Sequence, residues 1–340
     1  MHSNSSHGFL DPGSDLAGIF ANQAANYYRN PNSKWILFNV HSEQGNRMMQ
    51  RLENLSSAYF DKDGICYGGE LYPEQLEENT NMLYHLMHVE NKTVILAGAG
   101  AEWIAAVQKQ WSVHYNPYRL SIVSDKTLLT HKIQEDCMYL KEMHFLGLQR
   151  HFLNPGTKGI SQSIRLGELR NNASCADPYI RSSEFIYFDL NAVRAADCPA
   201  TTSQNPSGLY AEEAAALSRM AGMSDRNKCF VISDWNSEKD ERDITAELVA
   251  QMVWYFWEGC HLKQLDQALQ RHQLTNYQVH LHNIDYVLNF YKSEQSGKWW
   301  FEEPLVDNEF SNQLIPCSYE EYMLTAKDQI PKRILEKING

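Results

Sequence analysis

Short, uninterrupted runs of apolar residues alternate along this chain with longer stretches in which apolar residues recur every three or four positions. Runs of the first kind are typical of strands that are covered on both faces. Stretches of the second kind predict helices with one buried side. Strands are expected at 35–40, 93–99, 119–123, 141–149, 185–190, 228–234 and 286–291. Helices are expected at 15–28, 71–90, 211–223, 245–262 and in the tail at 319–339, and a loop is expected at 41–47.

This alternation of strands and helices predicts an α/β fold. Consecutive strands that are joined through helices pair in parallel, and the helices then cover both faces of the sheet. We therefore expect three layers, α/β/α, around a mostly parallel sheet of about eight strands. Residues 1–13 are expected to form a polar head, and the length of the rest allows either one large α/β domain or two average domains.

The strand expected at 185–190 carries the first candidates for function. Asp189 interrupts its apolar run near the end, and Asn191 follows two residues later. Side chains two apart on a strand point to the same side, and open parallel sheets bind ligands beyond the carboxyl ends of their strands. One interpretation is therefore a ligand-binding pair. The alternative is that Asp189 caps the turn after the strand, and spacing alone does not separate the two.

The charge and the cysteines narrow the class of protein. The 340 residues include 30 basic and 42 acidic side chains, which give a net charge of −12. This charge argues against binding to nucleic acid or to an anionic membrane surface. No segment reaches the roughly 20 apolar residues of a membrane span, and the N-terminus has no apolar signal-peptide core. Seven scattered cysteines without a CxxC pair indicate reduced thiols, so a cytoplasmic location is expected.

Three other features are weaker signals. Gly98 and Gly100 follow a strand, but they complete neither GxxxxGK nor GxGxxG, so the spacing does not support a phosphate-binding loop. His41 also follows a strand, where a surface or capping role is favoured over ligation. His280 and His282 form an HxH pair that is able to bind zinc. Without acidic or cysteine partners nearby in the sequence, histidines that are hydrogen-bonded or exposed to solvent are favoured over a zinc site.

Several stretches resemble one known family. FDLNAVR at 188–194 and GLYAEEAAALSRMAG at 208–222 follow the pattern of the arginase and formimidoylglutamase family, the ureohydrolases. RLGELR at 165–170 and FYKS at 290–293 make the resemblance closest to its formimidoylglutamase-like branch. The resemblance runs from about residue 35 to the C-terminus and implies that residues 14–340 form one arginase-like domain. Because family members commonly form oligomers, the resemblance also points to a homo-oligomer. The sequence itself does not determine the oligomeric state.

The family holds two Mn²⁺ ions with four aspartates and two histidines, and the resemblance implies that most of these ligands are absent here. The family's Gly-Gly-x-His turn corresponds to 98–101, so Ala101 replaces a histidine. Its Asp-Ala-His-x-Asp run places Ser124, Lys126 and Leu128 at three ligand positions. Alanine and leucine cannot coordinate a metal, and an ammonium group repels a dication.

A shift of that alignment by one residue gives a second possibility. Asp125 then takes the first ligand position, and Thr127 and Leu129 take the other two, so at most one ligand survives in either case. Asp189 is retained on the central strand, but Asn191 is neutral and offers only a weak carbonyl ligand. Since hard, charged oxygen ligands together with histidine suit manganese, no metal is expected at this degraded site.

Two further residues complete the candidate site. Asp234 aligns with a family glutamate that holds the substrate's guanidinium or formimino group, and it keeps the charge on a shorter side chain. Lys126 offers the positive charge that the metals would have supplied, and we hypothesise that it pairs with Asp189. Asp189, Asn191, Asp234 and Lys126 are thus remnants of a catalytic site, and no catalytic residue is assigned.

Two functions compete. The favoured one is a catalytically inactive homologue that binds a small molecule or a protein partner. The alternative is an active C–N hydrolase on a formimino or guanidino substrate, formimidoylglutamase-like, which uses Mn²⁺ at a divergent site or metal-free chemistry through Lys126, Asp189 and Asp234. An open, basic, ligand-sized pocket would favour small-molecule binding. A pocket filled by Trp103, Lys126 or Leu128 would favour a structural or partner role.

Overall fold

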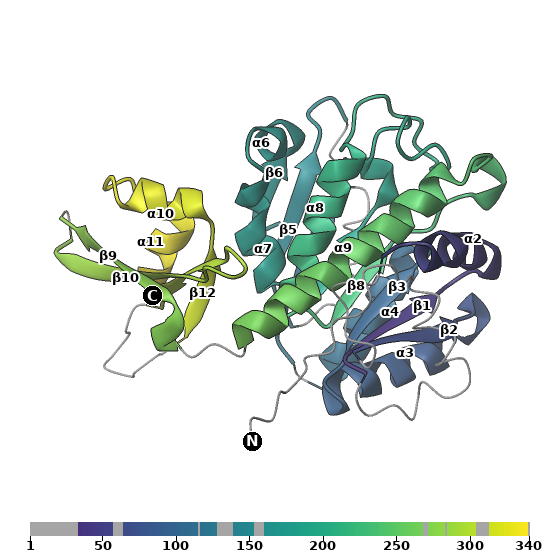
Figure 1. Ribbon diagram of the computed structural model, residues 1–340, viewed down its shortest axis with the longest axis horizontal. Helices are drawn as coiled ribbons and strands as arrows, with labels where there is room; N and C mark the ends of the chain where they lie inside the picture. Colours follow the sequence, from purple (N-terminus) through teal and green to yellow (C-terminus); the bar gives the residue numbers. More distant parts are fainter. Residues whose placement is uncertain are drawn as a thin grey trace, which may run out of the picture.

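A parallel sheet of eight strands forms the centre of the molecule (Figure 1). The computed structural model describes residues 33–56, 64–114, 116–127, 139–152, 160–267, 271–282, 284–303 and 313–338. The strand order is β2-β1-β3-β8-β7-β4-β5-β6, and every neighbouring pair is parallel. The predicted sheet of about eight mostly parallel strands is confirmed.

The bounds of the inner strands follow the hydrophobic pattern closely, whereas the edge strands β2 and β6 were not predicted from it. The strands of the main sheet are β1 (Trp35–Asn39), β2 (Ile65–Glu70), β3 (Thr93–Ala97), β4 (Tyr118–Val123), β5 (Leu140–Leu148), β6 (Gln162–Arg165), β7 (Phe185–Phe188) and β8 (Cys229–Ile232). The helices around this sheet are α2 (Ser42–Glu53), α3 (Leu76–Tyr84), α4 (Ala101–Val113), α6 (Leu166–Asn171), α7 (Asp177–Ser182), α8 (Ala211–Gly222) and α9 (Ile244–Gln267). No helix among the described residues is long and apolar enough to cross a membrane.

Two hydrophobic cores lie on opposite faces of the sheet. Leu37 of β1 packs in the core under α2, α8 and α9, whereas its neighbour Phe38 packs in the core under α3 and α4. Because successive side chains of a strand point to opposite faces, both faces of such a strand must be apolar. This geometry explains the unbroken apolar runs and confirms the three-layer α/β/α prediction.

The residues after α9 form a smaller lobe, which we call the C-terminal lobe (271–338). Its antiparallel sheet has the order β12-β11-β10-β9 and its own hydrophobic core. The lobe lies beside α7 in Figure 1, with α10 and α11 above its sheet. A single domain over 14–340 stays a prediction, but its last part has a separate sheet. The elements are β9 (Thr275–Leu281), β10 (Tyr286–Lys292), β11 (Trp299–Glu302), β12 (Leu314–Cys317), α10 (Tyr319–Thr325) and α11 (Lys332–Ile338).

Two predictions about elements are wrong. Residues 41–47 were expected to form a loop, but most of them belong to α2, in which Glu43 and Asn46 are exposed while Met48 and Leu52 enter the core. Gly45 lets this helix approach β1, because a Cβ there would lie 2.5 Å from Asn39 Nδ2. The strand at 286–291 is also not the last one, since β11 and β12 follow it. The head at 1–13 and the helix at 15–28 lie outside the described residues.

Candidate functional site

The topology brings the predicted site residues to one edge of the sheet. Strands β3, β8, β7 and β4 are consecutive neighbours, and all four are parallel, so their carboxyl ends meet at the same edge. The residues after these ends form what we call the strand-end site. This edge is where open α/β sheets bind ligands. The residues of the strand-end site are Ala101, Ser124, Asp125, Lys126, Asp189, Asn191 and Asp234.

Asp189 caps the short turn that follows β7. Its Oδ1 accepts hydrogen bonds from the backbone amide of Asn191 at 3.0 Å and from the Asn191 side chain at 2.8 Å. Its Oδ2 accepts a bond from the Ser124 hydroxyl at 3.0 Å. Asp189 and Asn191 therefore lie together because of the 3-10 turn Leu190–Ala192, and not through the alternation of a strand. Burial raises the pKa of the Asp189 carboxyl, and these hydrogen bonds oppose that rise.

Asp125 is a second buried carboxyl at this edge. It is 0% exposed, and among the described residues neither of its side-chain oxygens has a hydrogen-bond partner. Burial raises its pKa to about 6; nearby Lys126 opposes the rise and Asp189 adds to it. In the sequence, Asp125 reaches a ligand position only when the alignment is shifted by one residue. Its position at the end of β4 was the available signal, but its missing partners could not be read from the sequence.

Lys126 does not make the predicted ion pair. Its side chain is half-buried and its ammonium lies 5.7 Å from the centre of the Phe152 ring, a cation–π contact. Within the part of the chain that the structure describes, it forms no ion pair with Asp189. The hypothesis of a direct Lys126–Asp189 pair is therefore wrong. The positive charge still acts at longer range, since it lowers the pKa values of Asp125 and Asp189.

Asp234 lies beyond β8 and keeps access to solvent. Partial removal of water raises the pKa of its carboxyl, and repulsion from Glu102 adds to the rise. Glu102 lies in the first turn of α4. Burial also raises the pKa of Tyr187 on β7, with further contributions from Asp189 and Asp234. Tyr187 was missed by the sequence analysis because it lies inside an apolar run.

Trp103, Lys126 and Leu128 were named as residues able to fill a pocket at this edge, and the structure describes the first two. Trp103 is fully buried in the core beneath α4. Leu128 lies outside the described residues. The pair His280 and His282 lies far along the chain in the C-terminal lobe, where His280 is hydrogen-bonded to Asp285 at 3.0 Å.

Comparisons with known proteins identify the fold. No protein-family model and no curated protein matches the sequence. Among solved structures, Trypanosoma cruzi formiminoglutamase with Mn²⁺ matches with a TM-score of 0.61 at 13% identity, over 73% of this chain and 98% of that one. Bacillus subtilis formimidoylglutamase matches with a TM-score of 0.62 at 12% identity, over 77% of this chain and 97% of that one. The chain has the arginase-superfamily fold.

A third solved structure with this fold is the agmatine ureohydrolase of Thermoplasma volcanium. It matches with a TM-score of 0.55 at 17% identity, over 73% of this chain and 95% of that one. The predicted resemblance is thus confirmed at the level of the fold. All three matched chains are covered almost completely, while about a quarter of this chain has no counterpart in them.

The donor atoms at this edge of the arginase-superfamily fold do not fit a dinuclear manganese site. Ala101 offers no ligand atom, Ser124 offers a hydroxyl that already donates to Asp189, and Lys126 is a cation. Throughout the described ranges, no group of three or more His, Cys, Asp or Glu side chains is arranged to hold a metal ion. Two dications close together require several ionised carboxylates.

Proposed function

We propose that this protein is a catalytically inactive member of the arginase-superfamily fold that acts through binding. The observation that carries the proposal is the chemistry at the ends of β3 and β4. The positions that the resemblance assigns to metal ligands contain Ala101, Ser124 and Lys126. The strand framework persists while the ligand chemistry does not, which is the pattern expected when a fold is kept for another purpose.

The Asp189 carboxylate makes hydrogen bonds within the protein. Both oxygens of Asp189 accept hydrogen bonds, from Ser124 and Asn191, and they hold the ends of β4 and β7 together. The Ser233 hydroxyl likewise accepts a bond from the Leu190 amide at 2.9 Å and links the ends of β7 and β8. These contacts give Asp189 a structural role that needs no metal.

Metal uptake and amidine hydrolysis test this proposal. We would incubate the wild type, Asp189→Asn and the control Glu241→Gln with excess Mn²⁺, desalt them and measure bound metal. Glu241 is exposed and lies outside the strand-end site. The expected result is near-zero metal in all three proteins and no release of product from formimidoylglutamate, arginine or agmatine.

A different result would overturn the proposal. About two ions per wild-type chain, retained by Glu241→Gln and lost by Asp189→Asn, would mean that the metal ligands are not the ones assigned here. Hydrolysis that is lost in Asp189→Asn would establish an enzyme, whether or not metal is bound.

The second candidate function is an active C–N hydrolase on a formimino or guanidino substrate. The observation that favours it is the survival of Asp125, Asp189 and Asp234 at one edge, with raised pKa values. A carboxyl with a pKa of about 6, such as Asp125, is suited to proton transfer near neutral pH. Its complete burial opposes contact with a substrate. The hydrolysis assay above distinguishes this candidate from the first.

A further inference from the structure

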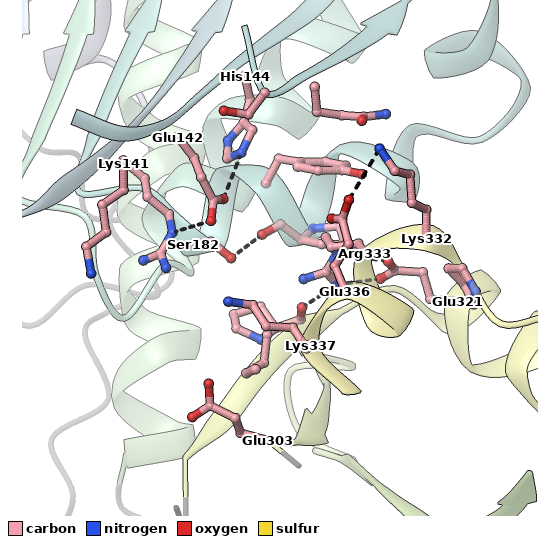
Figure 2. A pocket seen from close by; sticks show the side chains of 18 of the residues that line it. Lys141, Glu142, His144, Ser182, Glu303, Glu321, Lys332, Arg333, Glu336 and Lys337 are labelled. Carbon is pink, nitrogen blue, oxygen red and sulfur yellow. Dashed lines mark hydrogen bonds and ion pairs between the residues drawn. The ribbon is translucent and has the colours of Figure 1, made fainter. Parts of the chain in front are cut away.

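A polar cavity of about 780 Å³ lies between the main sheet and the C-terminal lobe (Figure 2). On one side it is lined by the amino-terminal parts of β4, β5 and β6 and by α7. On the other side it is lined by β12, α10 and α11. Because the main-sheet strands are parallel, this cavity lies at the opposite edge from the strand-end site. Its size is in the range of small-molecule sites, about 300–1,000 Å³.

The lining carries an excess of positive charge in an acidic protein. It contains six Lys or Arg side chains and four Glu side chains, whereas the whole chain has a net charge of −12. An anion is repelled by the net charge of the molecule as a whole, whereas the excess of cations in this concave lining attracts it. The cations are Arg119, Lys141, Arg226, Lys332, Arg333 and Lys337, and the anions are Glu142, Glu303, Glu321 and Glu336.

The arginines of the lining are already paired, and they make its walls rigid. Glu142 bridges Arg119 at 3.4 Å and His144 at 3.2 Å, and these partners, His144 first, lower its pKa to about 2. Across the cavity, Arg333 donates to both oxygens of Glu321 at 3.0 and 2.7 Å. Walls that are ordered before a ligand arrives reduce the entropy cost of binding.

Two lysines remain without an ion pair. Within the described ranges, neither Lys141 on β5 nor Lys337 on α11 is paired with a carboxylate, whereas Lys332 pairs with Glu336 at 3.3 Å. Figure 2 shows Lys141 on the main-sheet wall and Lys337 on the wall of the C-terminal lobe. Glu303 lies well apart from the paired Glu142 and Glu321 in the same view.

We propose that this cavity binds a small polyanion, with Lys141 and Lys337 holding it from the two lobes. Each ammonium group offers three donors and a compact charge, which suits both phosphate and carboxylate groups. A phosphorylated metabolite and a polycarboxylate share this chemistry. The site is separate from the strand-end site, so the inference holds whether or not that edge hydrolyses a substrate.

Calorimetric titration of the full chain tests the proposal with two probes, inorganic pyrophosphate and citrate. The double variant Lys141→Met/Lys337→Met removes both charges and keeps the aliphatic stems. The matched control Lys239→Met/Lys327→Met changes the net charge equally, at two exposed lysines outside the cavity. We expect wild type and control to bind one or both probes and the cavity variant to bind at least about tenfold more weakly.

The pattern of binding identifies the source of the anion. Binding of pyrophosphate alone indicates a phosphorylated ligand, and binding of citrate alone a polycarboxylate. Equal weakening by each single variant, Lys141→Met and Lys337→Met, is expected if the ligand spans both lobes. The proposal is overturned if neither probe binds the wild type, or if cavity and control variants bind equally. Thermal unfolding of each variant verifies that it is folded.

Discussion

At the scale of single residues, buried charge without compensation is the most informative feature. Asp189 and Asp125 are both buried carboxyls at one sheet edge, but within the described part of the chain the Asp189 carboxyl has hydrogen-bond partners and the Asp125 carboxyl has none. A buried ionised group without partners is costly, so burial raises the pKa of Asp125 to about 6. The folded protein therefore binds a proton here that the unfolded chain releases at lower pH.

Replacing Asp125 with asparagine is expected to stabilise the protein in a pH-dependent way. The folded pKa of about 6 lies above the unfolded value near 4, so the carboxyl destabilises the fold fully above pH ~6. Asp125→Asn should raise the free energy of unfolding by up to about 3 kcal/mol at pH 8. The gain should shrink as the pH falls through 6 and vanish below about 4. Urea unfolding at several pH values measures it, and an equal gain at all of them would exclude the charge as its cause.

The sequence predicted which residues gather at this edge better than what they contact. Asp189, Asp234 and Ser124 could be placed because each follows an apolar strand. The partner of Lys126 could not be predicted, because its flexible side chain is able to contact several groups that come close to it only in the folded chain. Its contact with Phe152 depends on how the segment after β5 returns across the end of β4.

At the scale of elements, the close crossing of α8 and α9 depends on two glycines. A Cβ on Gly222 would lie 1.9 Å from the carbonyl oxygen of Phe256, and one on Gly259 would lie 2.2 Å from that of Arg219. Both contacts would be with backbone atoms, which cannot move away through a rotamer change as a side chain can. The two helices can therefore cover one face of the sheet only at this separation.

The variant Gly222→Ala should force the two helices apart. We expect it to lower the free energy of unfolding by about 1–3 kcal/mol, the usual cost of overpacking a dense core. Gly167→Ala is the matched control, because a Cβ at Gly167 in α6 meets nothing within 4 Å. The control should be neutral or slightly stabilising. Chemical unfolding compares the two, and equal stability would contradict the role of Gly222.

The elements themselves were largely predictable from the hydrophobic pattern. The inner strands of the main sheet are largely buried on both faces, so their apolar runs were recognised. The edge strands β2 and β6 were missed, because most of their residues are half-buried or exposed. Helix α2 was missed because its first residues, after His41, are polar, and only its later turns contribute apolar side chains. The strands of the C-terminal lobe carry mixed polar and aromatic residues, since they have one exposed face, and β11 and β12 were not recognised.

At the scale of the whole molecule, buried cations fasten the C-terminal lobe to the main domain. The Arg181 side chain is 0% exposed; it pairs with Asp177 on α7 and donates to the carbonyls of Trp299 at 2.7 Å and Cys317 at 3.1 Å. Lys298 of the lobe pairs with Asp266 of α9 at 2.8 Å. These contacts also fix the walls of the cavity between the two parts.

Removal of the Arg181 charge should weaken this attachment strongly. Arg181→Met leaves Asp177 without its cation and two lobe carbonyls without a donor, and the loss of one partner from a buried pair costs about 3–5 kcal/mol. The control Lys332→Met breaks an exposed ion pair, which is worth less than about 1 kcal/mol. Hydrogen exchange in β11 and β12 and the urea midpoint measure both variants. Unchanged exchange in Arg181→Met would refute the anchoring role.

The position of β8 has a consequence for how the chain acquires its structure. This strand lies between β3 and β7, so it joins the half-sheet β2-β1-β3 to the half-sheet β7-β4-β5-β6. About 130 residues separate it from β3 along the chain. During synthesis both half-sheets therefore expose an open strand edge until residue 232 has emerged, and such edges invite pairing with other chains. The single sheet can form only after β8, one short strand, has been synthesised. This order favours slow folding, and until β8 pairs, the open strand edges need protection from other chains.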